Sequence, residues 1–259
     1  MSYIPFHEPG TITMFAGPCS VESFEQFDEV GQALKASGLT WIRGGTFKPR
    51  TSPYAFQGLG EEGLKIMAAV GSAYGLKTLS EVVDTKRIDM AISYVDGLQI
   101  GTRNMSNFEL LKAIALGTSQ NHMPVLFKRG MASTIDEWLS AVEYLMTEGN
   151  PNIMLCERGL RTFETATRFT LDISAIPVIH KRSLLPICAD VSHPAGQVDL
   201  VPALAKAAVA AGCDALMIEV HPNPSQAKSD ASQQMTIPEF GELLAELRVI
   251  AAAVGKTIV

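Results

Sequence analysis

Four side chains of the types that bind metals follow apolar runs at widely separated places in the chain. They are Cys19 in "AGPCSVES", His193 in "DVSHP", Glu219 in "MIEVHP" and Asp230 in the segment beyond it. One thiolate, one imidazole and two carboxylates suit a borderline divalent ion such as Mn²⁺, Fe²⁺, Co²⁺ or Zn²⁺. The spacing between them is long-range, so a second interpretation stays open, in which Cys19 is a nucleophile and His193 its base.

A second set of side chains is cationic. The stretch "RGGTFKPRTSP" packs Arg43, Lys48 and Arg50 with hydroxyl side chains into a segment rich in Gly and Pro. Three further cations also follow apolar runs: Arg103, Lys128 and Arg158. In a chain of formal net charge -6, this many cations near one another predict an anionic substrate, because Arg forks suit phosphate and carboxylate groups. Arg129 and Arg161 are predicted instead to be solvated surface charges.

Short apolar runs alternate along the chain with longer segments of helical period. The predicted strands span residues 12–17, 39–45, 76–82, 95–101, 123–130, 151–159, 185–193 and 213–222. The predicted helices span residues 23–38, 60–75, 85–94, 107–117, 134–149, 171–182, 199–212 and 238–255. Alternating strands and helices indicate parallel strand pairing, and eight such units in 259 residues predict a (β/α)₈ TIM barrel.

The barrel is predicted to be a single domain over residues 1–259, because no composition break or low-complexity linker divides the chain. An open doubly wound sheet is the structural alternative, but "GPCSVES" is not the GxGxxG fingerprint that would open its first helix. In a barrel, the carboxyl-terminal ends of all strands meet at one face, the face that carries active sites. The polar residues above follow strand ends, as does Glu81 of "LSEVVD", so we expect them to share that face.

Composition excludes several classes of partner. A sequence pI of about 5.4 argues against nucleic acid or an anionic membrane. No apolar run approaches the roughly 20 residues of a membrane-spanning helix. The first residues resemble no export signal, so the expected location is the cytoplasm, where four scattered cysteines are not expected to form disulfides.

Several long segments together resemble one family. In chain order the main ones are "AGPCSVES", "RGGTFKPRTSPYAFQGLG", "SEVVD", "QIGTRNMSN", "FKRG", "ERGLRTFE", "DVSHPAGQ" and "GCDALMIEVHPNPSQAKSDASQQM". They resemble the motifs of 3-deoxy-D-arabino-heptulosonate 7-phosphate (DAHP) synthases, in the short form related to 3-deoxy-D-manno-octulosonate 8-phosphate (KDO8P) synthases. The resemblance runs from Thr13 to the last predicted helix.

The resemblance implies a barrel enzyme that condenses phosphoenolpyruvate with erythrose 4-phosphate and releases phosphate, the first step of the shikimate pathway. It implies one divalent metal ion, for which the ligands would be Cys19, His193, Glu219 and Asp230. It also implies a phosphoenolpyruvate site lined by Arg43, Lys48, Glu81, Arg103, Lys128 and Arg158. Arg50 and Thr51 would hold the phosphate of the aldose. Within this frame, Lys48 is the candidate proton donor to the developing alkoxide, and Glu81 is expected to position the attacking water.

Three other functions compete with this one. KDO8P synthase carries out the same chemistry on arabinose 5-phosphate, but it usually has "KANRSS"-like residues where this chain has "FKPRTS". A sialic-acid-type synthase differs more widely in its motifs, and a non-catalytic binding barrel would not need intact ligands and cations in every loop. Relatives form homodimers or homotetramers, and a separate chorismate mutase is a candidate partner. No fused regulatory domain is expected, and hence no inhibition by aromatic amino acids.

Overall fold

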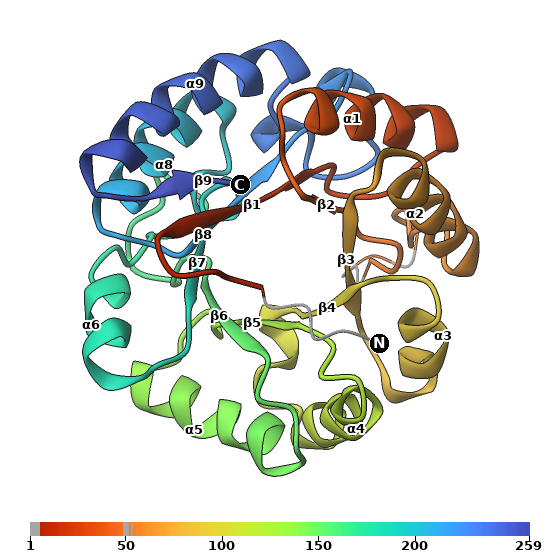
Figure 1. The fold of residues 1–259 in the computed structure, drawn as a ribbon, viewed down its shortest axis with the longest axis vertical. Helices are drawn as coiled ribbons and strands as arrows, with labels where there is room; N and C mark the ends of the chain where they lie inside the picture. The colour runs from red at the N-terminus through yellow and green to blue at the C-terminus, as the bar shows by residue number, and fades with distance from the viewer. Residues whose placement is uncertain (1–5, 49–51, 53) are drawn as a thin grey trace.

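The structure is a computed structural model that describes residues 6–48, 52 and 54–259. Its parallel strands close into the predicted (β/α)₈ barrel, with β1 paired to both β2 and β8 (Figure 1). The barrel strands are β1 (Thr11–Gly17), β2 (Trp41–Arg43), β3 (Lys77–Val82), β4 (Gly97–Ile100), β5 (Val125–Lys128), β6 (Ile153–Glu157), β7 (Ile187–Asp190) and β8 (Ala215–Glu219). A short strand, β9 (Thr257–Ile258), pairs with the start of β1.

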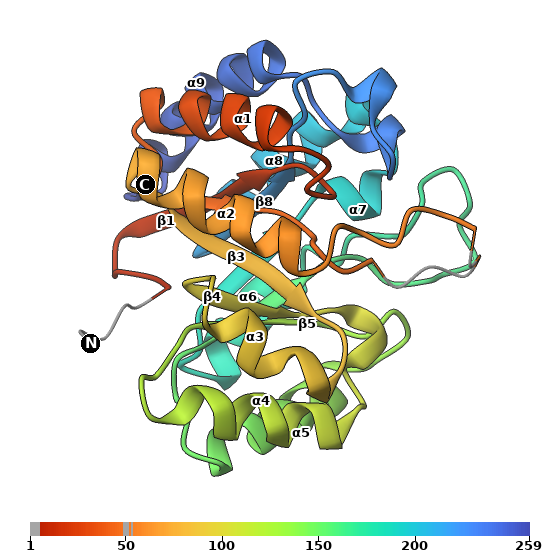
Figure 2. The ribbon, with the colours of Figure 1, turned by 90° about the vertical axis from the view of Figure 1, so that its right-hand side faces the viewer.

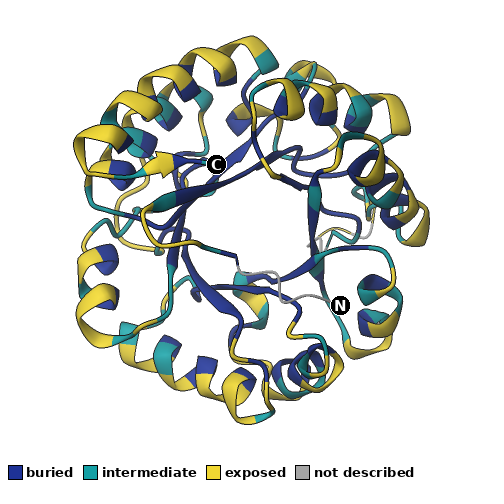
Figure 3. Ribbon diagram, viewed as in Figure 1, coloured by how far each residue is buried: buried dark blue, intermediate teal, exposed yellow. Residues whose placement is uncertain are grey.

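Helices surround the barrel and bury one face each against it, so that the strands are buried and the outer helix surfaces are exposed (Figure 3). The α-helices are α1 (Phe24–Ala36), α2 (Glu61–Tyr74), α3 (Ile88–Ile92), α4 (Phe108–Ser119), α5 (Ile135–Thr147), α6 (Ala175–Arg182), α7 (Ser192–Ala195), α8 (Val201–Ala210) and α9 (Ile237–Ala253). Short 3₁₀ turns join several of them: η1 (Thr85–Arg87), η2 (Thr102–Asn104), η3 (Val198–Leu200), η4 (Pro224–Gln226) and η5 (Ala231–Gln233).

The predicted helix over residues 171–182 is too long. Helix α6 begins only at Ala175, which puts Pro177 in its first turn. A proline is tolerated there because the first turn has no hydrogen-bond partner for its N–H, whereas the predicted span would have put it in the helix interior. The residues before Ala175 therefore belong to a long loop, residues 158–174, on the active-site side of the barrel.

Aromatic rings fill the amino-terminal end of the barrel. The ring of Phe6 lies 5.3 Å from that of Phe15 and 5.1 Å from that of Trp41, measured between centroids. These rings join a buried cluster with apolar side chains of the other strands, among them Leu126 and Met217. Figure 2 shows the chain's amino-terminal segment at this end and the longest loops at the opposite end.

Asp214, just before β8, ties several elements together at the same amino-terminal end. One carboxylate oxygen accepts a hydrogen bond from Lys256 Nζ at 2.8 Å, and the other lies 2.8 Å from His180 Nε2 and accepts from the backbone N–H of Ile187 at 3.0 Å. His7 Nε2 lies 3.7 Å away. Burial would raise the pKa of Asp214, but these partners, chiefly Lys256, hold it below its usual value. The chain termini, α6 and two strands therefore share one buried carboxylate.

Among the described residues, no helix is long and apolar enough to cross a membrane.

Candidate metal and anion site

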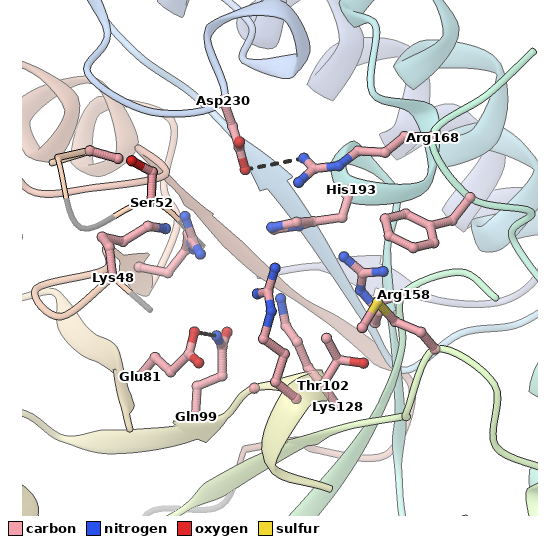
Figure 4. A pocket seen from close by; sticks show the side chains of 16 residues that line it. Lys48, Ser52, Glu81, Gln99, Thr102, Lys128, Arg158, Arg168, His193 and Asp230 are labelled. Carbon is pink, nitrogen blue, oxygen red and sulfur yellow. Dashed lines mark hydrogen bonds and ion pairs between the residues drawn. The ribbon is translucent and has the colours of Figure 1, made fainter. Parts of the chain in front are cut away.

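A cavity of about 380 Å³ lies at the carboxyl-terminal end of the barrel (Figure 4). Most of the residues singled out from the sequence line it: Arg43, Lys48, Glu81, Arg103, Lys128, Arg158, His193 and Asp230. Ser52 of the "KPRTSP" stretch and Ala55, two residues after that stretch, add a wall, while Arg50 and Thr51 lie outside the described residues. The predicted convergence at one mouth is therefore observed for every site residue that the structure describes, with Cys19 and Glu219 directly beside the cavity.

Cys19 reaches this position because of the backbone at the end of β1. Gly17 has φ +145°, and a Cβ there would lie 2.0 Å from the carbonyl oxygen of Arg43. Only glycine permits this close approach of β1 to β2, and Pro18 then ends the strand. The backbone N–H of Cys19 donates to Gln234 Oε1 at 2.9 Å, which fixes the residue against the segment after β8.

Ligand atoms from Cys19, Glu219 and Asp230 lie within 4.8 Å of one another. The Cys19 Sγ is 3.6 Å from Asp230 Oδ2. His193, on the single turn α7, presents Nε2 3.7 Å from Glu219 Oε1, and its Nδ1 lies 2.7 Å from Asp190 Oδ2. The carboxylate of Asp190 thus lies against the far nitrogen of the ring, the position where metal-binding histidines commonly have a second partner. A thiol and two carboxylates close together, with an imidazole beside them, fit a borderline divalent cation.

Burial and neighbouring charges together raise the pKa of Cys19 and lower the pKa of Asp230. Burial raises the pKa of the Cys19 thiol to about 11, and the neighbouring Glu219 adds to the effect. Burial would also raise the pKa of Asp230, but Arg168, His193 and Lys48 bring it down to about 2. Lys48 Nζ donates to Cys19 Sγ and to the Cys19 carbonyl oxygen, each at 3.0 Å. Without a cation the cluster thus holds a protonated thiol beside two carboxylates, and a bound cation would displace the thiol proton.

The cationic part of the cavity contains buried hydrogen-bond donors that have no acceptor among the described residues. Arg158 is 4% exposed, its guanidinium lies 4.1 Å from the centroid of the Phe169 ring, and its Nε and Nη1 have no hydrogen-bond partner among the described residues. Burial lowers the pKa of this guanidinium. Buried donors left without partners are costly, so they indicate a site built for an anionic acceptor.

Two other cations of the site are already paired with carboxylates. Lys128 Nζ lies 2.6 Å from Asp190 Oδ2, and Arg43 Nη1 lies 3.2 Å from Glu219 Oε1. Arg43 also donates to the Pro18 carbonyl oxygen at 2.6 Å. These pairs connect the anion-binding side of the cavity to the ligand cluster.

Glu81 projects into the cavity from β3 and accepts a hydrogen bond from Gln99 Nε2 at 3.1 Å (Figure 4). A Cβ at Gly101 would lie 2.1 Å from Glu81 Oε1, so this glycine makes room for the carboxylate.

The prediction that Arg129 is a solvated charge is wrong. Arg129 is 4% exposed, and its Nη1 donates to Glu157 at 2.9 Å and to Asp172 at 2.8 Å. Side chains alternate along a strand, so while Lys128 points into the barrel, Arg129 points outward against α5, with its guanidinium 5.8 Å from the Trp138 ring. Arg161 is exposed as predicted.

The sequence reasoning did not assign roles to three polar residues that shape the site: Asp190, Arg168 and Gln233. Asp190 belongs to the polar strand ends, which was a usable signal. Arg168 and Gln233 lie in loops, and neither is part of a pattern that marks it as facing the cavity.

A parallel barrel with a cationic cavity and a cluster of metal-ligand side chains at its carboxyl-terminal mouth defines an enzyme of the TIM-barrel class. The sequence profile of the DAHP synthetase I family matches residues 9–253, and the chain belongs to that family.

Known relatives agree with this assignment. The chain is 46% identical over 249 residues to the phospho-2-dehydro-3-deoxyheptonate aldolase of Thermotoga maritima, an alignment that covers 96% of this chain and 72% of that protein. A crystal structure of the Thermotoga DAHP synthase superposes with a TM-score of 0.93 at 43% identity, covering 98% of this chain and 72% of that one. A truncated form of the Thermotoga enzyme gives a TM-score of 0.90 at 41% identity, with coverage of 98% and 91%.

More distant relatives carry the other activity. The 2-dehydro-3-deoxyphosphooctonate aldolase of Caulobacter vibrioides is 31% identical over 254 residues, covering 91% of this chain and 86% of that protein.

Proposed function

We propose that this protein is a metal-dependent DAHP synthase, which joins phosphoenolpyruvate to erythrose 4-phosphate, consumes one water and releases inorganic phosphate. The observation that carries this proposal is the single cavity in which Lys48, Arg103 and Arg158 lie beside the Cys19–Glu219–Asp230 cluster. The 46% identity to the Thermotoga enzyme supports the choice of the four-carbon sugar.

Charge is the first requirement of this reaction. Phosphoenolpyruvate carries a phosphate and a carboxylate, and a second phosphate must come near it. At an effective dielectric constant of about 20, two like unit charges 4 Å apart repel by about 4 kcal/mol, so cations must offset the repulsion. Arg158 offers free buried donors for this role, and Arg103 and Lys128 line the same cavity. Arg50 and Thr51 would hold the aldose phosphate.

The chain's own groups account for the proton steps. C3 of phosphoenolpyruvate bonds to the aldehyde carbon, and the aldehyde oxygen gains a proton, for which Lys48 is the donor. Burial would lower the pKa of Lys48, but the Cys19 sulfur in its thiolate form and the carboxylate of Glu219 raise it above its usual value, so the donor is charged before reaction. Glu81 positions the water that adds at C2; this water returns one proton to Lys48, and its second proton leaves with the phosphate as the C2–O bond breaks and the C2 ketone forms.

A divalent ion held by Cys19, His193, Glu219 and Asp230 would supply a Lewis acid for the aldehyde. Arg43 bonds Glu219, and Asp190 lies against His193, so both ligands are already oriented by neighbours that do not bind the ion.

Phosphate release is the test. Phosphoenolpyruvate would be supplied with erythrose 4-phosphate or with arabinose 5-phosphate, with and without EDTA, and with Mn²⁺, Co²⁺, Fe²⁺ or Zn²⁺ restored afterwards. We expect release with erythrose 4-phosphate, loss in EDTA and recovery with a divalent ion.

Each alternative gives a different result. Release with arabinose 5-phosphate alone would make the chain a KDO8P synthase, like the relative from Caulobacter. Full activity after complete metal removal would contradict the metal site while leaving the substrates as proposed.

The assembly and regulation of the protein belong to the same proposal. We expect a homodimer or homotetramer in the cytoplasm, and a separate chorismate mutase is the candidate partner for regulation. A single barrel domain over residues 1–259 is part of the same proposal, supported by the one barrel that the described residues form.

A further inference from the structure

Arg168 lies between two cavities at the barrel mouth. It comes from the long loop of residues 158–174, and together with Asp230 it lines both the main cavity and a second polar cavity of about 380 Å³. Its guanidinium Nη1 donates to Asp230 Oδ2 at 3.2 Å and to Gln233 Oε1 at 2.7 Å. Figure 4 shows Arg168 and Asp230 facing each other above His193.

The backbone of Asp230 also has an unusual conformation. Its φ of +47° is left-handed, which is uncommon for residues other than glycine, although Asp and Asn adopt it more readily than most. The oxygen that accepts from Arg168 is the same Oδ2 that lies 3.6 Å from Cys19 Sγ. The direction in which Arg168 holds this carboxylate therefore sets its distance from the thiol.

Gln233 extends the contact to the second carboxylate of the cluster. Its amide Nε2 donates to Glu219 Oε2 at 2.7 Å while its Oε1 accepts from Arg168, and the side chain is 1% exposed. Both polar atoms of one buried amide are thus used. Asp230, Arg168, Gln233 and Glu219 form an unbroken chain of hydrogen bonds from one ligand carboxylate to the other.

The Arg168 side chain is itself held at its base. A Cβ at Gly196 would lie 2.6 Å from Arg168 Cβ, so the backbone of the turn after α7 packs directly on it. Its guanidinium lies 5.9 Å from the centroid of the Phe169 ring, the ring against which Arg158 packs. With 38% of the side chain exposed, the ion pair with Asp230 contributes little to stability, so the contact matters for geometry.

We propose that Arg168 and Gln233 are a positioning pair that holds the carboxylates of Asp230 and Glu219 at the spacing a divalent cation requires. The inference rests on the proposed metal site and adds to it two residues beyond the four proposed ligands.

Two physical effects of Arg168 on metal affinity have opposite signs. Its positive charge repels a divalent cation, so if charge alone mattered, Arg168→Ala would tighten metal binding. If Arg168 orients Asp230, the same substitution weakens binding, and losing a residue that orients a ligand lowers metal affinity about 10- to 100-fold. The sign of the change therefore separates the two roles without any measurement of catalysis.

The experiment is a titration of the purified, metal-free protein with Co²⁺, followed by the thiolate-to-cobalt absorption of Cys19. The variants are Arg168→Ala, Arg168→Lys and Gln233→Leu, with Arg161→Ala as a control from the same loop. Arg161 is exposed, and its contact among the described residues is with Met131. Circular dichroism and urea unfolding would verify that each variant is folded.

We expect Arg168→Ala and Gln233→Leu to weaken Co²⁺ binding about 10- to 100-fold, and the double variant to be less than additive because the two residues act as one chain. Arg168→Lys keeps the charge but lacks the fork, so it should lose less than Arg168→Ala. Arg161→Ala should bind as the unchanged protein does.

The outcomes separate this inference from the proposed function. Unchanged or tighter Co²⁺ binding by Arg168→Ala and Arg168→Lys would overturn the positioning role while leaving the metal site intact. Absence of the cobalt–thiolate band in the unchanged protein would instead overturn the metal site on which the inference rests. If Arg168→Ala does not fold, Arg168→Lys and Gln233→Leu decide by the same criterion.

Discussion

Replacing Asp190 by Asn tests how the anion-binding side of the cavity is connected to the cluster of metal-ligand side chains. The carboxylate of Asp190 is fully buried at the end of β7, with Lys128 Nζ at 2.6 Å and His193 Nδ1 at 2.7 Å. Burial would raise its pKa, but His193 and Lys128 hold that pKa well below the usual range, so the group is ionised at neutral pH. Asn keeps the shape of the side chain and removes its charge.

The cost can be worked from this geometry. At 2.6 Å and an effective dielectric constant of about 20, the attraction between Lys128 and Asp190 is about 6 kcal/mol before desolvation is subtracted. Removing one partner of a buried pair typically costs about 3–5 kcal/mol, because the other charge stays buried without compensation. For a chain of this size that loss lowers the melting temperature by roughly 6–20 °C. The same change frees the His193 ring, so metal affinity should fall about 10- to 100-fold.

Urea unfolding and Co²⁺ titration would measure the two effects on the same samples. A cycle with Lys128→Met supplies the control, because removing both charges should cost less than the sum of the single changes. If the unfolding free energies of Asp190→Asn and Lys128→Met add to within about 0.5 kcal/mol, the two groups are not coupled and the reasoning fails.

Three further predictions concern catalysis, stability and regulation. Lys48→Met should lower turnover about 10²- to 10⁴-fold while phosphoenolpyruvate still binds by calorimetry; near-normal turnover would remove Lys48 from proton transfer. Asp214→Asn should cost about 1–3 kcal/mol of unfolding free energy near pH 7, since it breaks the contacts with Lys256, His180 and the Ile187 N–H. Because the folded pKa of Asp214 is lowered, its contribution is fully present above the unfolded pKa of about 3.9 and is lost as pH falls through the folded value. The difference between variant and parent in urea unfolding should therefore be present at pH 5 and shrink below about pH 4, with His7, His180 and Lys256 as the groups that face the carboxylate; a constant difference from pH 5 down to pH 2 would contradict this. We predict that Phe and Tyr leave the activity of the purified chain unchanged, and inhibition by either would contradict this prediction.

The barrel and most of its site could be predicted because each rests on a local pattern. Alternating periods predicted the strands and helices, and closure of the barrel brought Cys19 close to Glu219 and Asp230, although more than two hundred positions separate Cys19 from Asp230 in the sequence. It was harder to predict which of two neighbouring residues at the end of a strand faces the cavity. Lys128 and Arg129 are adjacent and alike in charge, yet one faces the cavity and the other the helix layer.

The roles of Arg168 and Gln233 could not be predicted from the sequence. Both lie outside the long helices and the strands, where no periodic sequence pattern predicts the direction of a side chain. Their positions depend on close packing against a turn from another part of the chain, as the approach of Arg168 to Gly196 shows. Such contacts arise only once the whole barrel is folded.

The aromatic rings of Phe6, Phe15 and Trp41 also determine from which end of the barrel small molecules can reach the cavity. Because they fill one end of the barrel, small molecules reach the cavity from the opposite end. Reactants and products must then enter and leave through the same end of the barrel, past the loops that line the cavity there.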